Sequence, residues 1–319
     1  MILRTNVKLN FGLNVLRKRD DGYHDIETLF VPCHEFGDTL EVISGDDYSR
    51  TSASLFARYG GLMDPEGQPA LGDTPPQRSE DGLRRGRTAP PDLGGELAQG
   101  ISEDGKLMIT IAREEGVDWE PLKDLCAKAY FLLAKDFQLP PVKIFLEKNA
   151  PVGAGLGGGS ADAAFTLKAL NELCELNLSD AELAEYASKL GSDCAFFVWN
   201  KPMIGTGRGE ILEPFELNME DYVVKVLVPE GVSVSTAEAY RGIVPRCSND
   251  EGTIAPSEFK AVLQHPVEEW KDLLVNDFEA TVFKAHPELA AIKQSLYDSG
   301  AIYAAMSGSG SAIFGIYKK

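Results

Sequence analysis

The chain of 319 residues carries 31 Lys and Arg against 49 Asp and Glu, so its formal net charge at pH 7 is 31 − 49 = −18. A surface this acidic repels phosphate backbones and anionic headgroups, and no segregated basic patch is evident, which disfavours general binding to nucleic acid or to a membrane surface. Hydrophobic residues make up 44% of the chain and charged residues 25%, which is typical of a globular protein with one large domain or about two domains.

Targeting and redox signals are weak in this sequence. The first residues contain no apolar segment of secretory length, and no later run approaches the ~20 apolar residues that a membrane-spanning helix needs. We therefore expect a cytoplasmic protein. The cysteines are five in number and widely spaced, which predicts reduced thiols in the core rather than disulfides or a zinc site: Cys33, Cys126, Cys174, Cys194 and Cys247. No ligand-spaced set of histidines is present, so no structural metal is expected.

The first predicted elements are strands. Apolar and β-branched runs predict strands over residues 7–16, 26–32 and 39–43, with a polar turn at 19–22. The next clear strand is expected over residues 106–112.

Residues 45–105 separate two of these strands and differ from the rest of the chain in composition. They hold 11 of the chain's 31 glycines and 6 of its 18 prolines, and they show no sustained period. A structureless loop of this length is unusual in a compact domain, so we interpret the segment as a flexible or irregular insertion in a hairpin. Because a short turn could join the flanking strands, we expect the insertion to be dispensable for catalysis.

The middle of the chain alternates helices and strands. Helical spacing of apolar residues predicts a helix over residues 123–137, and a strand is expected over 142–146. The glycine-rich segment 151–160 then opens a second helix, because the apolar residues that follow it lie on one helical face. A third helix begins at Ser179, whose sequence Ser-Asp-Ala-Glu fits a capping box, and ends at Gly191.

Hairpins dominate the C-terminal part. A β-branched strand is expected over residues 222–228, a helix over 287–299, and strands over 301–306 and 312–317. Helices interspersed with hairpins favour an α+β fold over a doubly wound parallel sheet. We place the boundary near residue 220, which predicts domains over residues 1–220 and 221–319.

Five glycines within residues 153–159 point to a phosphate site. They let backbone N–H groups approach a ligand closely, and the start of the following helix presents partial positive charge. Ser160, in the first turn, is placed to cap the helix or to bind Mg²⁺ or a phosphate oxygen. A Walker A loop is excluded by the missing Gly-Lys-Ser/Thr, and a dinucleotide fold is disfavoured because no acidic residue ends a second strand about 20 residues on.

Two motifs resemble those of the GHMP kinases, the superfamily of galactokinase, homoserine kinase and mevalonate kinase. Residues 151–164 (PVGAGLGGGSADAA) are similar to its second motif and residues 306–311 (MSGSGS) to its third. Residues 8–10 (KLN), 21–24 (DGYH) and 190–197 (LGSDCAFF) further resemble the branch of that superfamily that phosphorylates a cytidine diphosphate conjugate of methylerythritol.

The resemblance runs over residues 4–44 and 106–319 and implies both fold and reaction. The implied fold has two domains: an ATP-binding N-terminal domain like domain 2 of ribosomal protein S5, and a ferredoxin-like C-terminal domain. The implied reaction is phosphorylation of the 2-hydroxyl of the cytidine conjugate, with ATP and Mg²⁺, in the non-mevalonate isoprenoid precursor pathway. The residues alone indicate only a phosphate-binding protein, most simply a small-molecule kinase.

Two alternatives remain open. One is another GHMP kinase, for homoserine or a sugar, which residues 21–24 disfavour. The other is a catalytically silent nucleotide-binding relative, which the joint presence of Lys8, Asp193 and Ser160 disfavours. A small-molecule substrate is the only partner that the sequence predicts.

The resemblance also implies roles for particular residues. Asp193 matches the aspartate taken as the base for the substrate hydroxyl, and Lys8 matches the lysine that keeps this aspartate ionised and neutralises the migrating phosphoryl group. Substrate binding is implied for Asn10, Tyr23, His24 and Tyr240, because a His can read a cytosine edge and a Tyr can stack on the base. ATP binding is implied for Lys148, Pro151, Gly153, Ala154, Gly155, Leu156, Gly157, Gly158, Gly159 and Ser160. Asp124 stands where many relatives have an asparagine that contacts adenine, and a carboxylate lacks the amide donor.

Overall fold

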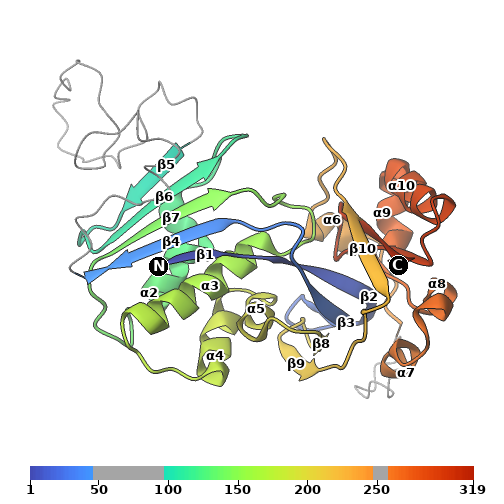
Figure 1. Cartoon of the computed structure of the whole chain (residues 1–319), viewed down its shortest axis with the longest axis horizontal. Helices are drawn as coiled ribbons and strands as arrows, with labels where there is room; N and C mark the ends of the chain where they lie inside the picture. The colour runs from blue at the N-terminus through green and yellow to red at the C-terminus, as the bar shows by residue number, and fades with distance from the viewer. Residues whose placement is uncertain (46–96, 247–257) are drawn as a thin grey trace. The chain divides into compact units, whose positions relative to one another are not determined.

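The computed structural model describes residues 1–45, 97–246 and 258–319 (Figure 1). The chain forms two compact units, each assembled from separate segments. The first comprises Met1–Thr5, Gly37–Ala150 and Gly159–Gly191, and the second comprises Asn6–Phe36, Pro151–Gly158 and Ser192–Lys319. The predicted boundary near residue 220 stays a prediction.

A five-stranded sheet forms the framework of the first unit. Its strands, in spatial order, are β1 (Ile2–Arg4), β4 (Thr39–Ser44), β7 (Val142–Lys148), β6 (Leu107–Arg113) and β5 (Leu97–Ile101). All neighbours are antiparallel except β6 and β7, which run parallel and are joined through a helical crossover. The strands predicted over residues 39–43, 106–112 and 142–146 are therefore present.

The strand order overturns the predicted hairpin. β4 and β6 do not pair, because β7 lies between them and pairs with both. Neighbouring strands lie about 4.8 Å apart, so the chain leaving β4 must cross at least two further strands to reach β5 at the far edge. The strands that flank residues 45–105 therefore do not form a hairpin, and the prediction of an insertion in a hairpin is wrong, whereas the expectation that the segment is dispensable for catalysis stays a prediction. Within that segment Leu97–Ile101 form β5, and residues 46–96 lie outside the described residues.

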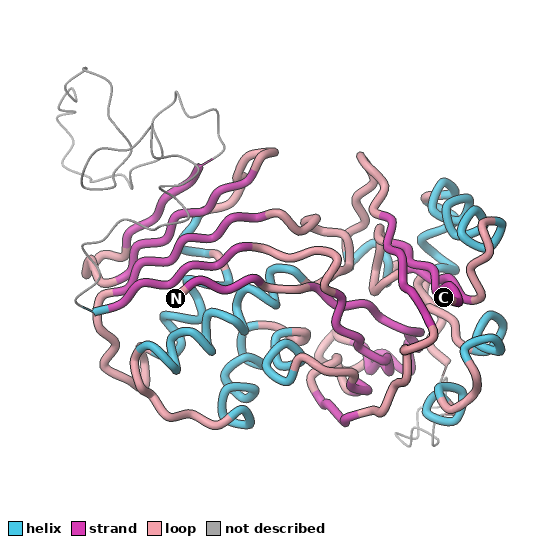
Figure 2. Tube along the Cα trace, in the orientation of Figure 1, coloured by secondary structure: helices cyan, strands magenta, loops and turns pink. Residues whose placement is uncertain are grey.

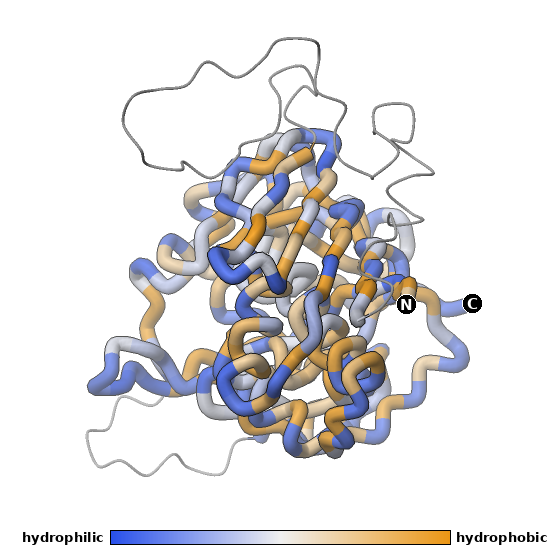
Figure 3. Tube along the Cα trace, turned by 90° about the vertical axis from the view of Figure 1, so that its left-hand side faces the viewer, coloured by the Kyte–Doolittle hydropathy of each residue, from blue (hydrophilic) through white to orange (hydrophobic). Residues whose placement is uncertain are grey.

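Helices cover one face of this sheet (Figure 2). They are the short 3-10 helix η4 (Pro121–Lys123), α2 (Leu125–Leu133), α3 (Gly158–Leu173) and α4 (Asp180–Leu190). β4, β6 and β7 each carry a run of three or four buried residues, and hydrophobic stretches of the tube are interspersed with hydrophilic ones (Figure 3). The predicted capping box at Ser179 is confirmed: its side chain accepts from the Glu182 N–H, and the Glu182 carboxylate accepts from Ser179.

The second unit contains two antiparallel sheets. One is ordered β2 (Val7–Lys18), β3 (His24–Cys33), β8 (Met203–Thr206) and β9 (Ile211–Pro214), and the other β10 (Tyr222–Leu227), β12 (Ile313–Lys318) and β11 (Tyr303–Met306). β2 is buried along most of its length, and its apolar residues Val7, Leu9, Phe11, Leu13 and Val15 alternate with Lys8, Asn10, Gly12 and Asn14. The predicted strands over 7–16, 26–32, 222–228, 301–306 and 312–317 are present to within a few residues.

Short helices complete this unit. They are α5 (Cys194–Trp199), α6 (Thr236–Tyr240), α7 (Phe259–Leu263), η5 (Val267–Glu269), α8 (Trp270–Leu273), α9 (Glu279–Ala285) and α10 (Pro287–Asp298). α10, predicted over residues 287–299, packs on β11 and β12 through buried Leu289 and Leu296. Phe278 and Val282 extend the same core.

Cysteine and helix properties bear on two further predictions. Cys126 and Cys194 are buried free thiols, Cys33 and Cys174 are partly buried free thiols, and Cys247 lies outside the described residues. None of the helices in the described ranges combines the length and the apolar character needed to cross a bilayer.

Candidate active site

Lys8 and Asn10 lie two residues apart on β2, so their side chains point to the same face of the strand. Both are buried, with 3% and 2% exposure. The Lys8 ammonium donates to Asn10 Oδ1 at 2.5 Å and to the Gly155 carbonyl at 2.9 Å, and it lies 3.5 Å from Asp193 Oδ2. These three oxygens match the three donors of an ammonium, which fixes the position of the charge.

Asn10 is oriented by its second polar atom. Its Nδ2 donates to Thr28 Oγ1 on β3 at 3.0 Å, and the Thr28 hydroxyl donates to the Gly12 carbonyl at 2.6 Å. The amide oxygen is therefore turned toward Lys8. The structure gives Asn10 a role in positioning Lys8, and its contact with a substrate stays a prediction.

Asp193 immediately precedes α5 and differs from Lys8 in exposure. Its side chain is 31% exposed and makes no capping hydrogen bond to the helix. Asp193 Oδ2 thus faces the buried Lys8 ammonium, while the Asp193 carboxylate stays accessible to a ligand. A carboxylate within reach of a ligand can accept a proton from an alcohol.

The glycine loop Pro151–Gly158 runs beside β2 in the second unit. Lys8 N–H donates to the Leu156 carbonyl at 2.9 Å, and Ala312 N–H donates to the Ala154 carbonyl at 3.1 Å. Within the described residues, the N–H groups of Gly155, Leu156 and Gly157 donate to no other group. Unpaired N–H donors at the start of a helix form a donor set that phosphate oxygens accept, so these residues fit a nucleotide phosphate.

A second glycine-rich turn, residues 307–310, packs against the same lysine. A Cβ added to Gly308 would lie 3.1 Å from the Gly155 carbonyl and 3.3 Å from Lys8 Nζ, so only glycine allows this approach. Ser307 Oγ accepts from the Asn10 N–H at 3.2 Å. The two motifs that are far apart in sequence therefore meet at Lys8.

Sequence analysis missed Asn276, which holds this turn. Its buried Nδ2 donates to the Met306 and Gly308 carbonyls, both at 2.8 Å. The only sequence signal is an Asn in the apolar run before α9, which is too common a pattern to single it out.

His24 and Tyr240, both predicted to contact a cytidine, lie together. Their rings stack at a centroid distance of 4.4 Å and an interplanar angle of 15°, and Phe278 packs edge-on against Tyr240. Burial, and to a smaller extent the charge of Asp193, raise the pKa of Tyr240 to about 12. Burial, and to a smaller extent Lys18, lower the pKa of His24, which favours a neutral ring with one donor and one acceptor.

Tyr23 does not join this stack. Its side chain is 56% exposed, and the Arg208 guanidinium lies 4.9 Å from its ring centroid. Of the two tyrosines considered for stacking on a base, Tyr240 is the one that the structure brings to His24. Arg208, in the turn between β8 and β9, was not identified from the sequence.

Lys148 lies at the end of β7 in the first unit, where two carboxylates surround it. Its ammonium donates to Asp162 Oδ2 at 2.6 Å and to Asp38 Oδ2. Ser160 lies in the first turn of α3, as predicted, and Asp124 caps α2 and accepts from Trp119 Nε1 at 3.0 Å. Ligand binding by Lys148 and Ser160 stays a prediction.

We expect Gly157→Val to raise the KM for ATP and also to lower kcat. Gly157 has φ +74°, and a Cβ there would lie 3.2 Å from the Lys8 side chain and 3.3 Å from Phe197. Steady-state kinetics check both effects. Gly231→Val is the matched control, because Gly231 has φ +72° but open space around it, so that variant carries the same backbone strain of about 1–2 kcal/mol without touching Lys8. Equal kinetics in the two variants would contradict the predicted contact with Lys8.

Comparison with known proteins adds independent evidence. The family described as GHMP kinases N terminal domain matches residues 124–201, and the family described as GHMP kinases C terminal matches residues 259–319. A 4-diphosphocytidyl-2-C-methyl-D-erythritol kinase from Bacteroides fragilis is 40% identical over 99% of this chain and 92% of its own length.

Solved structures agree with these matches. A crystal structure of 4-(cytidine 5'-diphospho)-2C-methyl-D-erythritol kinase has a TM-score of 0.64 and 28% identity, covering 99% of this chain and 89% of that chain. A homoserine kinase from Cytophaga hutchinsonii has a TM-score of 0.53 at 16% identity, covering 100% of this chain and 85% of that chain. The second likeness shows a shared fold alone.

Proposed function

Because the chain belongs to the 4-diphosphocytidyl-2-C-methyl-D-erythritol kinase family, we propose that it phosphorylates the 2-hydroxyl of 4-diphosphocytidyl-2-C-methyl-D-erythritol at the expense of ATP. The α+β GHMP kinase fold and the small-molecule kinase class expected from the sequence are confirmed. The observation that carries the proposal is the buried Lys8 ammonium, shared between the glycine loop and the accessible Asp193 carboxylate.

The proposed chemistry divides between the nucleotide and the chain. Bound ATP with Mg²⁺ would supply the γ-phosphoryl group. Asp193 would accept the proton of the substrate 2-hydroxyl while the oxygen of that hydroxyl bonds to the γ-phosphorus. The bond between the γ-phosphorus and the oxygen bridging to the β-phosphate would break in the same step, leaving ADP. Lys8, held by Asn10 and Gly155, would neutralise negative charge on the phosphoryl group without having to reorganise.

The glycine loop and the first turn of α3 are the proposed phosphate site. The unpaired N–H groups of Gly155, Leu156 and Gly157 suit the phosphate oxygens, and Ser160 is the proposed hydroxyl ligand for Mg²⁺. The remaining predicted residues of this site are Pro151, Gly153, Ala154, Gly158 and Gly159, which form its backbone.

His24 and Tyr240 are the proposed cytidine site. A neutral imidazole presents one donor and one acceptor to the amino group and ring nitrogen of cytosine, and an aromatic face supports its ring. Arg208 beside Tyr23 adds a cation that suits the diphosphate of the substrate.

We expect the uridine analogue of the substrate to lose at least about tenfold in kcat/KM. Uracil replaces the amino donor of cytosine with a carbonyl, and an unpaired buried polar group costs about 1–3 kcal/mol. Kinetics with both nucleotides in wild type and in His24→Ala check this, and the gap should narrow in the variant. Equal use of both analogues by the wild type would contradict the proposed cytidine site.

One assay tests the proposed function as a whole. ADP release is measured with 4-diphosphocytidyl-2-C-methyl-D-erythritol and, separately, with homoserine. Release with the cytidyl substrate alone supports the proposal, and release with homoserine alone would replace it with the other GHMP kinase activity. No release with either, in a protein that binds ATP, would favour a silent relative. The cytoplasmic location stays a prediction.

A further inference from the structure

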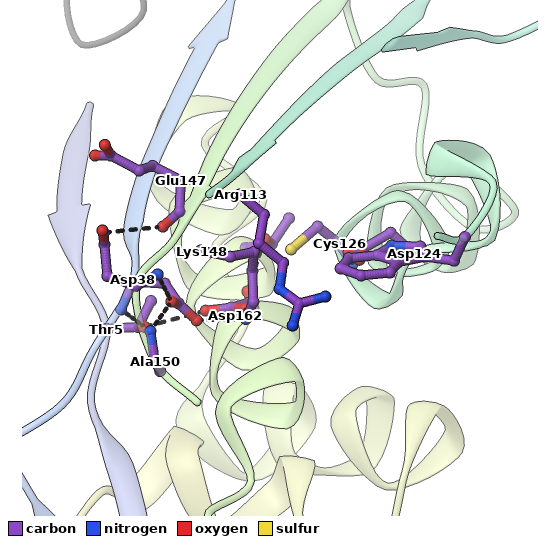
Figure 4. Close-up of polar contacts among 12 residues, drawn as sticks. Thr5, Asp38, Arg113, Asp124, Cys126, Glu147, Lys148, Ala150 and Asp162 are labelled. Atoms are coloured by element: carbon purple, nitrogen blue, oxygen red, sulfur yellow. Dashed lines mark hydrogen bonds and ion pairs between the residues drawn. The ribbon is translucent and has the colours of Figure 1, made fainter. Parts of the chain in front are cut away.

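Four residues with buried side chains form a closed ring of hydrogen bonds in the first unit, which the backbone N–H of Asp38 completes and which we call the stem ring: Thr5, Asp38, Lys148 and Asp162 (Figure 4). Lys148 donates to both carboxylates, Thr5 Oγ1 donates to Asp162 Oδ1 at 3.0 Å, and the Asp38 N–H donates to Thr5 Oγ1 at 3.0 Å. The side chains of Lys148, Asp38 and Asp162 are 5%, 0% and 1% exposed.

The stem ring holds the chain on both sides of the glycine loop. On the entry side, Asp38 Oδ1 accepts from the Asn149 N–H at 2.6 Å and from the Ala150 N–H at 2.7 Å, directly before Pro151. On the exit side, Asp162 lies in the first turns of α3, four residues after Gly158. Lys148 joins these two carboxylates, so a single ammonium ties the entry of the loop to its exit.

Between these points the loop accepts hydrogen bonds at the Ala154, Gly155 and Leu156 carbonyls, and fixed ends add to this anchoring. Gly153, Gly155 and Gly157 all have positive φ, and glycines lose more conformational freedom on ordering than any other residue. A ligand that orders a flexible glycine loop binds more weakly, because part of its binding free energy offsets the conformational entropy that the loop loses. A loop whose two ends are fixed has fewer conformations to lose, so less affinity is lost.

We propose that the stem ring presets the glycine loop for phosphate binding, so that Lys148 is a positioning residue that acts through Asp38 and Asp162 and does not contact the nucleotide. This inference rests on the proposed function, because it takes the loop as the phosphate site. It replaces the direct contact that the sequence predicts for Lys148 with an indirect one.

The charges of the stem ring agree with a Lys148 that binds Asp38 and Asp162 and does not bind a phosphate of the nucleotide. One ammonium between two carboxylates leaves no positive charge unused for a third, anionic partner. Burial, and the neighbouring charge of Asp38, raise the pKa of Asp162, whereas Lys148 opposes this shift. An asparagine at residue 162 has the same shape and keeps one polar atom toward Lys148 and one toward Thr5.

Two substitutions break the ring and leave the ammonium in place. Asp162→Leu removes both acceptors on the exit side, while Lys148 stays paired with Asp38. Its control is Asp162→Asn, whose oxygen can still accept from Lys148 and whose amide can still donate to Thr5 Oγ1. Thr5→Val removes the hydroxyl that bridges Asp38 and Asp162, and Thr5→Ser restores it, which keeps the test valid if Asp162→Leu fails to fold.

The readouts are the affinity for a non-hydrolysable ATP analogue, measured by calorimetry, and hydrogen exchange of the backbone amides of residues 152–158, with the melting temperature as the folding check. We expect Asp162→Leu and Thr5→Val to weaken binding about five- to tenfold and to speed exchange in the loop, with kcat and the KM for the alcohol substrate within about twofold of wild type. Asp162→Asn and Thr5→Ser should stay close to wild type.

Other outcomes overturn the inference. If both ring-breaking variants fold and bind the analogue as the wild type does, the ring does not preset the loop. If binding weakens without faster exchange in the loop, the ring acts by another route than the one proposed. Failure of the proposed function looks different, because the wild type itself would then not bind the analogue or not release ADP with the cytidyl substrate.

Discussion

Asp193→Asn is expected to lower kcat by about 10²–10⁴-fold, the range that general-base catalysis usually contributes, while ATP still binds. The substitution is isosteric and removes only the charge and the proton-accepting capacity. Asp193 is 31% exposed and caps no N–H of α5, and the amide oxygen of an asparagine there can still accept from the buried Lys8 ammonium. Turnover with saturating cytidyl substrate, and calorimetry with a non-hydrolysable ATP analogue, separate the two effects.

A matched control for this variant is Asp298→Asn, which changes an exposed aspartate at the end of α10. It should retain wild-type kinetics and melting temperature. If Asp193→Asn kept more than about a tenth of wild-type kcat, the loss would be smaller than general-base catalysis usually contributes, and Asp193 would not be the base. A large loss of ATP affinity would instead place Asp193 in the nucleotide site.

The long elements could be predicted because their local pattern and their packing agree. β2 alternates apolar and polar residues with the period of a strand, β3 contains an apolar run, and α10 carries a helical stripe that ends before Gly300. The elements that the sequence analysis missed are β1, β5, β8, β9 and the short helices α5 to α9. Most of these have three to seven residues, too few to show a period of 2 or 3.6 above chance, and packing within the unit fixes them.

Strand order is a different kind of information. The predicted hairpin joined strands that follow one another in the chain, which is the usual arrangement. Here β7, which comes after β6 in sequence, inserts between β4 and β6. No local pattern in either strand distinguishes the two arrangements, because alternating apolar residues suit both.

The proposed catalytic pair, Lys8 and Asp193, could be predicted from motifs, whereas the buried surroundings of Lys148 could not. Its partner Asp38 is 110 residues away in sequence and follows Gly37, where it has the appearance of an ordinary turn residue. Asp162 did carry a signal that was overlooked. It lies between buried Ala161 and Ala163 on α3, and a charge on such an apolar helical stretch needs a buried partner.

Lys8→Met is the second substitution with a large expected effect, a fall in kcat of about 10²–10³-fold or more, as for removal of a preorganised group that stabilises transition-state charge. The side chains are similar in length, so the space between Gly157 and Gly308 stays filled. Asn10 Oδ1 and the Gly155 carbonyl lose a donor, which should lower the melting temperature. Lys8→Arg should not restore activity, because Lys8 is only 3% exposed and the larger, planar guanidinium does not fit the space that the ammonium occupies.

The double variant Lys8→Met with Asp193→Asn gives the sharpest test of the pair. The two groups lie 3.5 Å apart, and an aspartate that has lost its ammonium, or an ammonium that has lost its base, is already ineffective. Residues that act as a unit are strongly non-additive, so the double variant should lose no more than about tenfold beyond the worse single variant. Losses that multiply in full would mean that Lys8 and Asp193 act at separate steps, and the proposed division of work between them would not hold.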